Sequence, residues 1–253
     1  MCREVVYIIS LLYLITAIIP SLYSISPLNE AALLVSFESR IDEKIHSQVM
    51  ALQEALNSQP FRGFTESVPA YASLAVFYDL WQVKENSDNT ITAFAEVRAY
   101  LEQLIGIISD NVSMTERRTI SIPVYYNGED LSSVAAGRGL TEQELIRIHC
   151  EKVYRVFMIG FLPGFAYMGP VDERIVTPRH TSPRLAVKPG SVGIAGAQTG
   201  IYPITSPGGW QLIGQTPVKI FDAAKEQPCL LQAGDSVQFV SISKQEFEKL
   251  NEY

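Results

Sequence analysis

Two arginines in a proline-stiffened loop are the residues best suited to hold an anion. The loop runs from Pro178 through Arg179 to Pro183 and Arg184. A guanidinium group offers a planar fork of N–H donors that matches the oxygens of a carboxylate or a phosphate. Arg179 and Arg184 are therefore candidate ligand-binding residues, although the same pattern is also typical of a solvated surface loop.

A glycine-rich stretch follows between residues 190 and 210. Glycines let the backbone approach a ligand closely, and exposed backbone amides can bind an anion. The stretch lacks the Gly-Lys-Ser/Thr ending of a Walker loop, and no β-α-β unit with a Rossmann fingerprint surrounds it. Its polar side chains Gln198, Thr199 and Tyr202 suit the orientation of an amide or a carboxylate better than proton transfer. We predict that these three also bind the ligand.

His149 is the candidate for acid–base catalysis, because it lies at the end of a predicted helix and near the aromatic-rich stretch 160–169. A histidine there could titrate near neutrality, although a capping or core histidine is the more common interpretation of such a residue. The aromatic stretch likewise either forms an apolar wall beside a ligand or fills a core. No serine sits in a G-x-S-x-G elbow, and no cysteine has a clear histidine partner. A self-sufficient hydrolase is hard to build from these residues.

The composition excludes several classes of protein. A net charge of −7 leaves no basic surplus to neutralise phosphates, so we expect no nucleic-acid partner. The three cysteines and three histidines are scattered and show neither a disulfide framework nor a zinc pattern, so no metal site is predicted. This cysteine usage suits a reducing cytosol. With 47% hydrophobic and 19% charged residues, the chain has the composition of a globular protein.

The first 21 residues form a hydrophobic extension that has three interpretations. Residues 5–19 are apolar apart from Ser10 and Thr16, and Pro20 follows. A signal peptide would have a basic start and a small-residue cleavage site, which are missing here. A membrane anchor needs about twenty apolar residues, which this segment barely reaches. The third interpretation is a start site assigned too far upstream. Because the rest of the chain looks cytosolic, we expect a cytoplasmic protein, with an N-terminal membrane anchor as the alternative.

The elements that must position these residues fall into two groups. The first, over residues 22–112, is predicted to be an α+β domain made from two β-β-α units. We expect strands at 22–26 and 31–37, separated by a turn at 27–29, and further strands at 66–69 and 73–78. Apolar residues recur every three or four positions over 41–56 and again over 91–108, which predicts two amphipathic helices. The polar stretch 109–118 marks the expected boundary.

The second group, over residues 118–245, is predicted to be a β-barrel. A strand is expected at 119–126, and Thr141 with Glu144 has the spacing of a capping box that opens a helix reaching His149. From residue 154 to 239, short β-branched and aromatic runs alternate with Pro and Gly, as in a barrel or sandwich with many tight turns.

At these stretches the sequence resembles the KipI family, also called allophanate hydrolase subunit 1 or the B-type subunits of 5-oxoprolinase. The resemblance runs from about Leu22 to Phe239. The matching motifs are VPAY at 68–71, FMIGFLPGF at 157–165, the two Pro-Arg pairs at 178–179 and 183–184, GSVGIAG at 190–196, QTGIYP at 198–203, SPGGW at 206–210 and LQAGD at 231–235. Several long motifs in the same order make this similarity specific.

The resemblance implies an N-terminal α+β sandwich domain followed by a C-terminal cyclophilin-like β-barrel. It implies that the chain works with two partners, a barrel protein resembling the C-type subunit of 5-oxoprolinase and a protein resembling the A-type one. The implied reaction opens 5-oxo-L-proline to L-glutamate while ATP, with Mg²⁺ possible, is hydrolysed to ADP and phosphate. Phosphorylation of the stable lactam carbonyl would create a leaving group, a step that needs cationic clamps and oriented donors. The chain alone is expected to be inactive.

Two alternatives stay open. The chain could be part of an allophanate hydrolase or carboxyltransferase system, which uses the same scaffold, or a KipI-like inhibitor of a sensor histidine kinase. It also departs from the family at two places, where the usual V-P-A-G-S appears as VKPGS at 187–191 and the usual I-G-R-T as IGQT at 213–216. The missing arginine puts an anion-binding role at Gln215 in doubt, while Lys188 adds a cation nearby.

Overall fold

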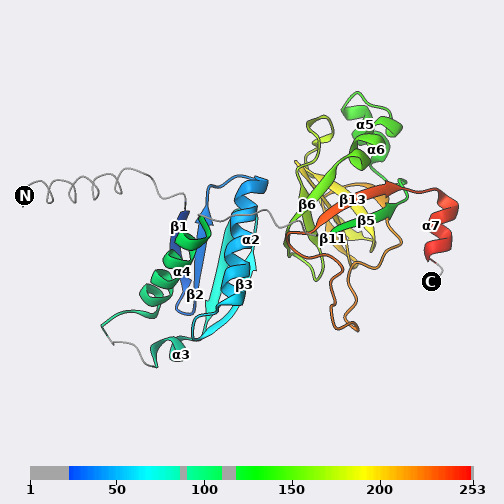
Figure 1. The fold of residues 1–253 in the computed structure, drawn as a ribbon. Helices are drawn as coiled ribbons and strands as arrows, with labels where there is room; N and C mark the ends of the chain where they lie inside the picture. The colour runs from blue at the N-terminus through cyan, green and yellow to red at the C-terminus, as the bar shows by residue number, and fades with distance from the viewer. Residues whose placement is uncertain (1–22, 86–89, 110–117, 252–253) are drawn as a thin grey trace, which may run out of the picture.

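The computed structural model describes residues 23–85, 90–109 and 118–251, which form an N-terminal half and a C-terminal half (Figure 1). The N-terminal half is a four-stranded antiparallel sheet with helices packed on it. Its elements are β1 (Tyr23–Asn29), β2 (Ala32–Phe37), α2 (Glu43–Ser58), β3 (Phe64–Pro69), β4 (Ser73–Tyr78), α3 (Leu80–Lys84) and α4 (Ala93–Ser109). The sheet order is β1-β2-β4-β3, in which the two hairpins β1-β2 and β3-β4 lie side by side.

Side-chain periodicity explains why these segments fold as they do. The alternate residues Leu33, Val35, Leu74 and Val76 of the two central strands point to the face that the helices cover. Each helix contributes a stripe of apolar side chains to this face, and both Leu52 of α2 and Leu101 of α4 are buried in the same core. Asp42 caps α2 by accepting hydrogen bonds from the amides of Lys44 and Ile45. Burial of these stripes against the sheet forms one continuous apolar core.

The expected turn at residues 27–29 is wrong. Residues 30 and 31 make the turn, and Pro27 lies inside β1. Edge strands tolerate proline because one side of such a strand has no neighbour to bond, and β1 is at the edge of its sheet. The short helix α3, which begins after the Asp79 cap, was also not predicted.

The C-terminal half is built on a seven-stranded sheet in the order β12-β9-β10-β7-β6-β13-β5. A two-stranded ribbon, β11-β8, accompanies this sheet. The elements are β5 (Thr119–Val124), α5 (Leu131–Gly137), α6 (Glu142–Glu151), β6 (Val153–Ile159), β7 (Ala166–Gly169), the 3₁₀ turn η1 (Glu173–Ile175), β8 (Arg184–Val187), β9 (Ser191–Ala195), β10 (Gln198–Ile201), β11 (Ser206–Gly208), β12 (Gln211–Gln215), β13 (Ser236–Ser241) and α7 (Lys244–Asn251).

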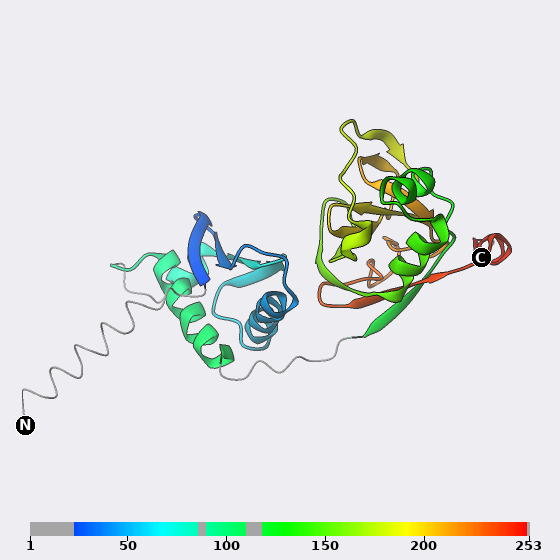
Figure 2. The same cartoon turned by 90° about the horizontal axis from the view of Figure 1, so that it is seen from above.

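The seven-stranded sheet curls until its two edges meet. Tyr125, just after β5, and Gln215, at the end of β12, exchange both backbone hydrogen bonds at 2.9 Å. The first and last long strands, β5 and β13, pair in parallel, while the other pairs in this sheet are antiparallel. Apolar side chains from the strands and from α5 and α6 fill the interior, and Figure 2 shows the two helices (green) lying together against the sheet. The expected rich β content with tight turns is confirmed, and α5 and α7 are additions that the sequence did not reveal.

Phe157 joins the two halves. It sits at a β-bulge in β6, where the register with β7 shifts between Val156 and Met158. A bulge releases a residue from the regular ladder and re-aims it. The carbonyl oxygen of Phe157 accepts a hydrogen bond from Nε2 of His46 on α2 at 2.8 Å. The Phe157 ring stacks on Tyr71, with ring centroids 5.1 Å apart, and both Phe157 and His46 are almost fully buried.

Predictions for residues 1–21 and for most of the boundary stretch lie outside the described residues. Within the part of the chain that the structure describes, no helix has the length and apolar content needed to cross a membrane.

The capping box of α6 gives the first test of this fold. Thr141 Oγ1 accepts from the Glu144 amide at 3.2 Å, and the Glu144 carboxylate accepts from the Thr141 amide at 2.8 Å, as predicted. We expect Thr141→Ala to lower the free energy of unfolding by about 1 kcal/mol, because the first turn of the helix loses its capping hydroxyl. Urea denaturation measures this. Thr181→Ala, at an exposed loop position, is the control, and equal losses in the two variants would contradict the capping role.

Candidate functional site

A groove in the C-terminal half gathers residues from all three stretches singled out in the sequence. Its volume is about 370 Å³. The lining residues are Phe161, Leu162, Tyr167, Arg179, Pro183, Tyr202, Ser206, Pro207, Gly208, Gly209 and Trp210. The aromatic stretch, the arginine loop and the glycine-rich stretch therefore converge in space, which their separation in the sequence did not guarantee.

The groove rests on a cluster of aromatic rings. Phe165 is buried beside it and meets Tyr167, Tyr202 and Trp210 edge-on, at centroid distances of 4.8, 5.2 and 5.3 Å. Edge-to-face contacts of this kind fix ring orientation beyond what burial alone does. The result is a packed aromatic floor, of which Tyr167, Tyr202 and Trp210 line the groove.

Glycine is required where the backbone closes on this floor. A Cβ at Gly208 would lie 2.4 Å from the hydroxyl oxygen of Tyr202, and a Cβ at Gly200 would lie 3.0 Å from the Trp210 ring. Phe161 at the rim has a positive φ of 70° and is 63% exposed. That left-handed region is sterically unfavourable for a bulky residue, so the rim holds an exposed ring in a strained conformation.

Arg179 is the cation of the groove. Its guanidinium lies over the Trp210 ring, 5.8 Å from the ring centroid, which is a cation–π contact. No carboxylate of the described residues forms an ion pair with it. Burial raises the pKa of the Tyr167 and Tyr202 hydroxyls, and the charge of Arg179 opposes that rise in both. Arg179 therefore faces two neutral hydroxyls, and its donors are available to an anion.

Arg184, in contrast, is already paired. Its Nη2 donates to both carboxylate oxygens of Asp130, at 2.6 and 2.8 Å, and its Nε donates to Glu129 at 3.2 Å. Asp130 is buried and also accepts from the Leu212 amide at 2.6 Å. The predicted clamp at Arg184 thus holds a carboxylate of the protein itself and ties the loop to the start of α5. Its role as a ligand-binding residue stays a prediction.

Gln198 and Thr199 lie apart from the groove. The Gln198 side-chain amide donates to the hydroxyl of Tyr71 in the N-terminal half. Thr199 is fully buried, and its hydroxyl donates to the Gly193 carbonyl at 3.1 Å. Of the five predicted ligand-binding residues, only Arg179 and Tyr202 line the same groove.

His149 lies in the core of the C-terminal half and has no exposed surface. The Thr199 hydroxyl donates its proton to the Gly193 carbonyl, so the hydroxyl oxygen accepts a hydrogen bond from Nε2 of His149 at 3.0 Å. The other ring nitrogen, Nδ1, then accepts a hydrogen bond from the Tyr126 hydroxyl at 2.7 Å. The ring also stacks on Phe239, with centroids 4.6 Å apart. Burial lowers the His149 pKa to about 3, so the ring stays neutral. This arrangement is that of a satisfied core histidine, and proton transfer by His149 stays a prediction.

The two departures from the family motifs lie in one recess. Lys188 and Gln215 both line a hollow of about 160 Å³, together with Arg184 and Ser191. The Gln215 side chain donates to the Pro189 carbonyl at 3.0 Å. Lys188, the added cation, and Gln215, which stands where the family usually has an arginine, therefore line the same hollow.

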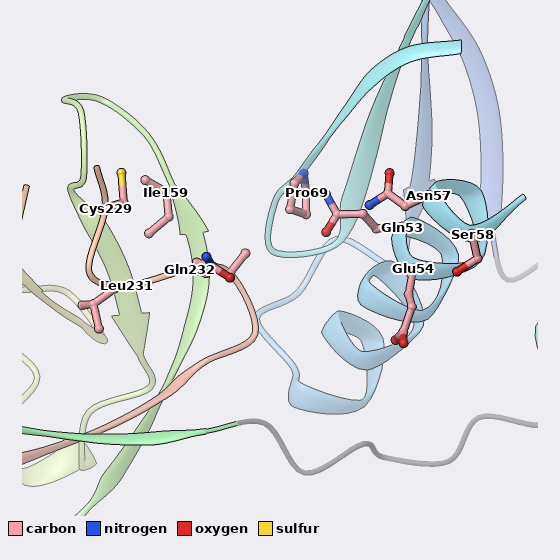
Figure 3. A pocket seen from close by; sticks show the side chains of 10 residues that line it. Gln53, Glu54, Asn57, Ser58, Pro69, Ile159, Cys229, Leu231 and Gln232 are labelled. Atoms are coloured by element: carbon pink, nitrogen blue, oxygen red, sulfur yellow. The ribbon is translucent and has the colours of Figure 1, made fainter. Parts of the chain in front are cut away.

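A larger hollow of about 610 Å³ lies between the two halves (Figure 3). Figure 3 shows side chains of α2 facing the segment that follows Cys229. None of its described lining residues is positively charged; they are Gln53, Glu54, Asn57, Ser58, Pro69, Ile159, Cys229, Leu231, Gln232 and Ala233. Size alone would favour this hollow, but an anionic ligand has no cation there, so we take the smaller aromatic groove as the candidate site.

No individual role in the site region was assigned from the sequence to Tyr71, Tyr167, Trp210 or Asp130. Tyr167 and Trp210 lie in stretches that had been singled out in the sequence, so the motifs around them could have indicated their place in the site. Asp130 gave none, because an isolated Asp before a short helix is indistinguishable from an ordinary cap. In residues 23–85, 90–109 and 118–251, no three metal-ligating side chains gather at one place.

Comparison with known proteins settles the family. The model of the carboxyltransferase domain, subdomain C and D, matches residues 23–231. The chain belongs to this carboxyltransferase-domain family. The B subunit of 5-oxoprolinase from Bacillus subtilis is 42% identical over 234 residues, which cover 91% of this chain and 97% of that protein. The corresponding B subunit from Haemophilus influenzae is 41% identical over 220 residues, covering 86% and 97%. The resemblance drawn from the motifs is confirmed.

Solved structures agree on the fold. The crystal structure of TTHA0988 is 34% identical with a TM-score of 0.71, and the match covers 84% of this chain but only 40% of that longer one. The urea amidolyase of K. lactis, at 18% identity and a TM-score of 0.70, shows the fold alone, over 91% of this chain and 15% of that one. The mixed α/β architecture with a curled sheet is therefore that of the carboxyltransferase-domain family.

Neutral burial of His149 predicts a pH dependence of stability. The folded pKa of about 3 lies below the value of about 6.5 in the unfolded chain, so the unfolded chain binds more protons between these values. Stability is then fully present above pH 6.5 and falls by about 1.4 kcal/mol per pH unit as the pH drops toward 3. We expect His149→Gln to flatten this decline in urea-denaturation curves recorded at several pH values. Because the carboxylates titrate alike in the unsubstituted protein and in His149→Gln, parallel curves of stability against pH would contradict the neutral burial of His149.

The Arg184–Asp130 pair predicts a structural loss. We expect Arg184→Gln to lower the free energy of unfolding by about 2–4 kcal/mol, because the buried Asp130 carboxylate loses its arginine partner. Arg174→Gln is the control, since Arg174 pairs with a partly exposed Asp172 and its side chain is 55% exposed. Thermal denaturation of both variants decides the matter, and an unchanged Tm for Arg184→Gln would refute the role.

Proposed function

We propose that this chain is the B-type subunit of an ATP-dependent 5-oxoprolinase. The observation that carries the proposal is identity of 36–42% to three curated B subunits of that enzyme, over 84–91% of this chain. In this proposal the C-terminal half is a cyclophilin-like β-barrel domain and the N-terminal half is a separate α+β domain, joined near residues 112–118. The complex opens 5-oxo-L-proline to L-glutamate with hydrolysis of ATP, in the cytoplasm.

The groove at Arg179 suits the lactam substrate. 5-Oxoproline has one carboxylate and one small planar ring. The guanidinium can take the carboxylate through two parallel N–H···O bonds, while Trp210 and Tyr167 supply ring surfaces in the same groove. The Tyr202 hydroxyl, whose pKa burial raises, remains protonated and able to donate. We assign Arg179 and Tyr202 to substrate binding.

The groove lacks what the chemistry needs next. Its described lining residues include no carboxylate, histidine, cysteine or lysine, and the Ser206 hydroxyl is turned to the adjacent Pro207 carbonyl. Activation of water needs a base of this kind, whereas the Tyr167 and Tyr202 hydroxyls, whose pKa burial raises, stay protonated. The triphosphate of ATP needs several cations, commonly with Mg²⁺, and one arginine does not supply them. We therefore place ATP and the acid–base groups on the A-type and C-type partners, and expect the isolated chain to be inactive.

A carboxyltransferase-type role is the second candidate, and the description of the matching family model favours it. An arginine beside aromatic rings would equally bind the carboxylate of allophanate. ATP-independent carboxyl transfer, or turnover of allophanate but not of 5-oxoproline, distinguishes this candidate. Inhibition of a sensor histidine kinase by the isolated chain would instead support the regulatory alternative.

Reconstitution tests the main proposal. The full chain mixed with its A-type and C-type partners should release glutamate from 5-oxoproline only when ATP is present, and the chain alone should release none. Arg179→Gln should raise the KM for 5-oxoproline about tenfold or more, because a charge-assisted pair contributes about 1.5–3 kcal/mol.

Arg138→Gln, at an exposed position after α5, is the matched control and should leave KM unchanged. Absence of glutamate from the complete mixture would contradict the function. A normal KM in Arg179→Gln would contradict only the location of the site.

A further inference from the structure

Tyr71 is a residue of the N-terminal half that contacts the wall of the groove, through Tyr167. It lies in the short turn between β3 and β4, and its ring stacks on Phe157 at a centroid distance of 5.1 Å and an interplanar angle of 26°. The same ring meets Tyr167 edge-on, at 6.4 Å and 69°. Its hydroxyl accepts a hydrogen bond from Gln198 at the start of β10. Three segments of the C-terminal half thus hold one side chain of the other half.

Tyr167 carries this contact into the groove. Its ring lies 5.9 Å from Trp210, and Trp210 supports the guanidinium of Arg179 at 5.8 Å. Tyr71, Tyr167, Trp210 and Arg179 therefore form an unbroken series of ring and cation–π contacts from the N-terminal half to the anion-binding group. Burial raises the pKa of Tyr71, and the charge of Arg179 partly opposes this, which agrees with the two groups lying near one another.

We propose that Tyr71 is a positioning residue for the groove, holding the Tyr167 ring in the orientation that a carboxylate ligand at Arg179 requires. The inference rests on the proposed function, since the groove must be the carboxylate site. It adds that the site is composite: the C-terminal half supplies every side chain that touches the ligand, and the N-terminal half fixes the shape of the wall.

The Tyr71 ring contributes to ligand binding because it holds the Tyr167 ring in place before the ligand arrives. Phe165 and Trp210 flank Tyr167 on the C-terminal side, and Tyr71 is its aromatic neighbour from the N-terminal side. Removal of the Tyr71 ring leaves a gap into which Tyr167 can rotate, and the ligand must then reorder the ring when it binds. Removal of the hydroxyl alone keeps the ring in place and affects only Gln198. The ring and the hydroxyl can therefore be tested separately.

Trp210 provides the spectroscopic readout. The chain has two tryptophans, Trp81 with 84% of its surface exposed and Trp210 with 5%. In a Trp81→Phe parent, fluorescence reports on the groove alone. Emission is recorded for the free protein and during titration with 5-oxo-L-proline, for the parent and for the added substitutions Tyr71→Ala, Tyr71→Phe and Tyr100→Ala. Tyr100 is the matched control, because its ring packs on Phe61 within the N-terminal half.

We expect Tyr71→Ala to shift the Trp210 emission of the free protein and to weaken 5-oxoproline binding roughly five- to tenfold. Tyr71→Phe should restore both properties nearly to the parent values, and Tyr100→Ala should change neither. Equal affinity in Tyr71→Ala and the parent would overturn the inference, as would equal weakening in Tyr71→Ala and Tyr100→Ala. If the Trp81→Phe parent binds no 5-oxoproline, the proposed ligand is refuted instead. If, in that case, Tyr71→Ala also leaves the Trp210 emission of the ligand-free protein unchanged, the positioning role is refuted as well.

Discussion

The β-bulge at Phe157 is the constraint on which the working geometry depends. A regular strand would use the Phe157 carbonyl in its own ladder, whereas the bulge presents it to His46 and turns the ring toward Tyr71. One residue thereby offers both a hydrogen-bond acceptor and an apolar face to the other half of the molecule. Because Phe157 and His46 are withdrawn from water, loss of the hydrogen bond or of the ring contact would lower the stability of this junction.

In the proposed function, the groove binds the substrate while other subunits supply the catalytic groups. Rings, glycines and a single arginine make a surface suited to orient a small anion, and its described lining contains no carboxylate, histidine, cysteine or lysine. The histidine that looked most able to titrate is buried in a complete hydrogen-bond network between Tyr126 and Thr199, where it serves the core. This division agrees with a family whose curated relatives are named as subunits.

Local patterns predicted much of the fold but little of the site. Periodicity located α2, α4 and the four N-terminal strands, and the capping box located α6, because these signals act within a few residues. The sequence could not show that Arg184 is paired within the protein while Arg179 is not. The carboxylate that pairs with Arg184 belongs to Asp130, which lies more than fifty positions earlier. The contact of Tyr71 with Tyr167 likewise depends on how two separate cores meet, which no pattern in either segment records.

The parallel pairing of β13 with β5 has a consequence for biosynthesis. Every strand of the N-terminal sheet precedes residue 79, so that half can fold while the ribosome is still translating the rest. The curled sheet must wait for its last strand, residues 236–241, before β5 gains its neighbour. The N-terminal half can therefore hold His46 and Tyr71 in place before Phe157 is synthesised, and can act as a template on which the later half is assembled.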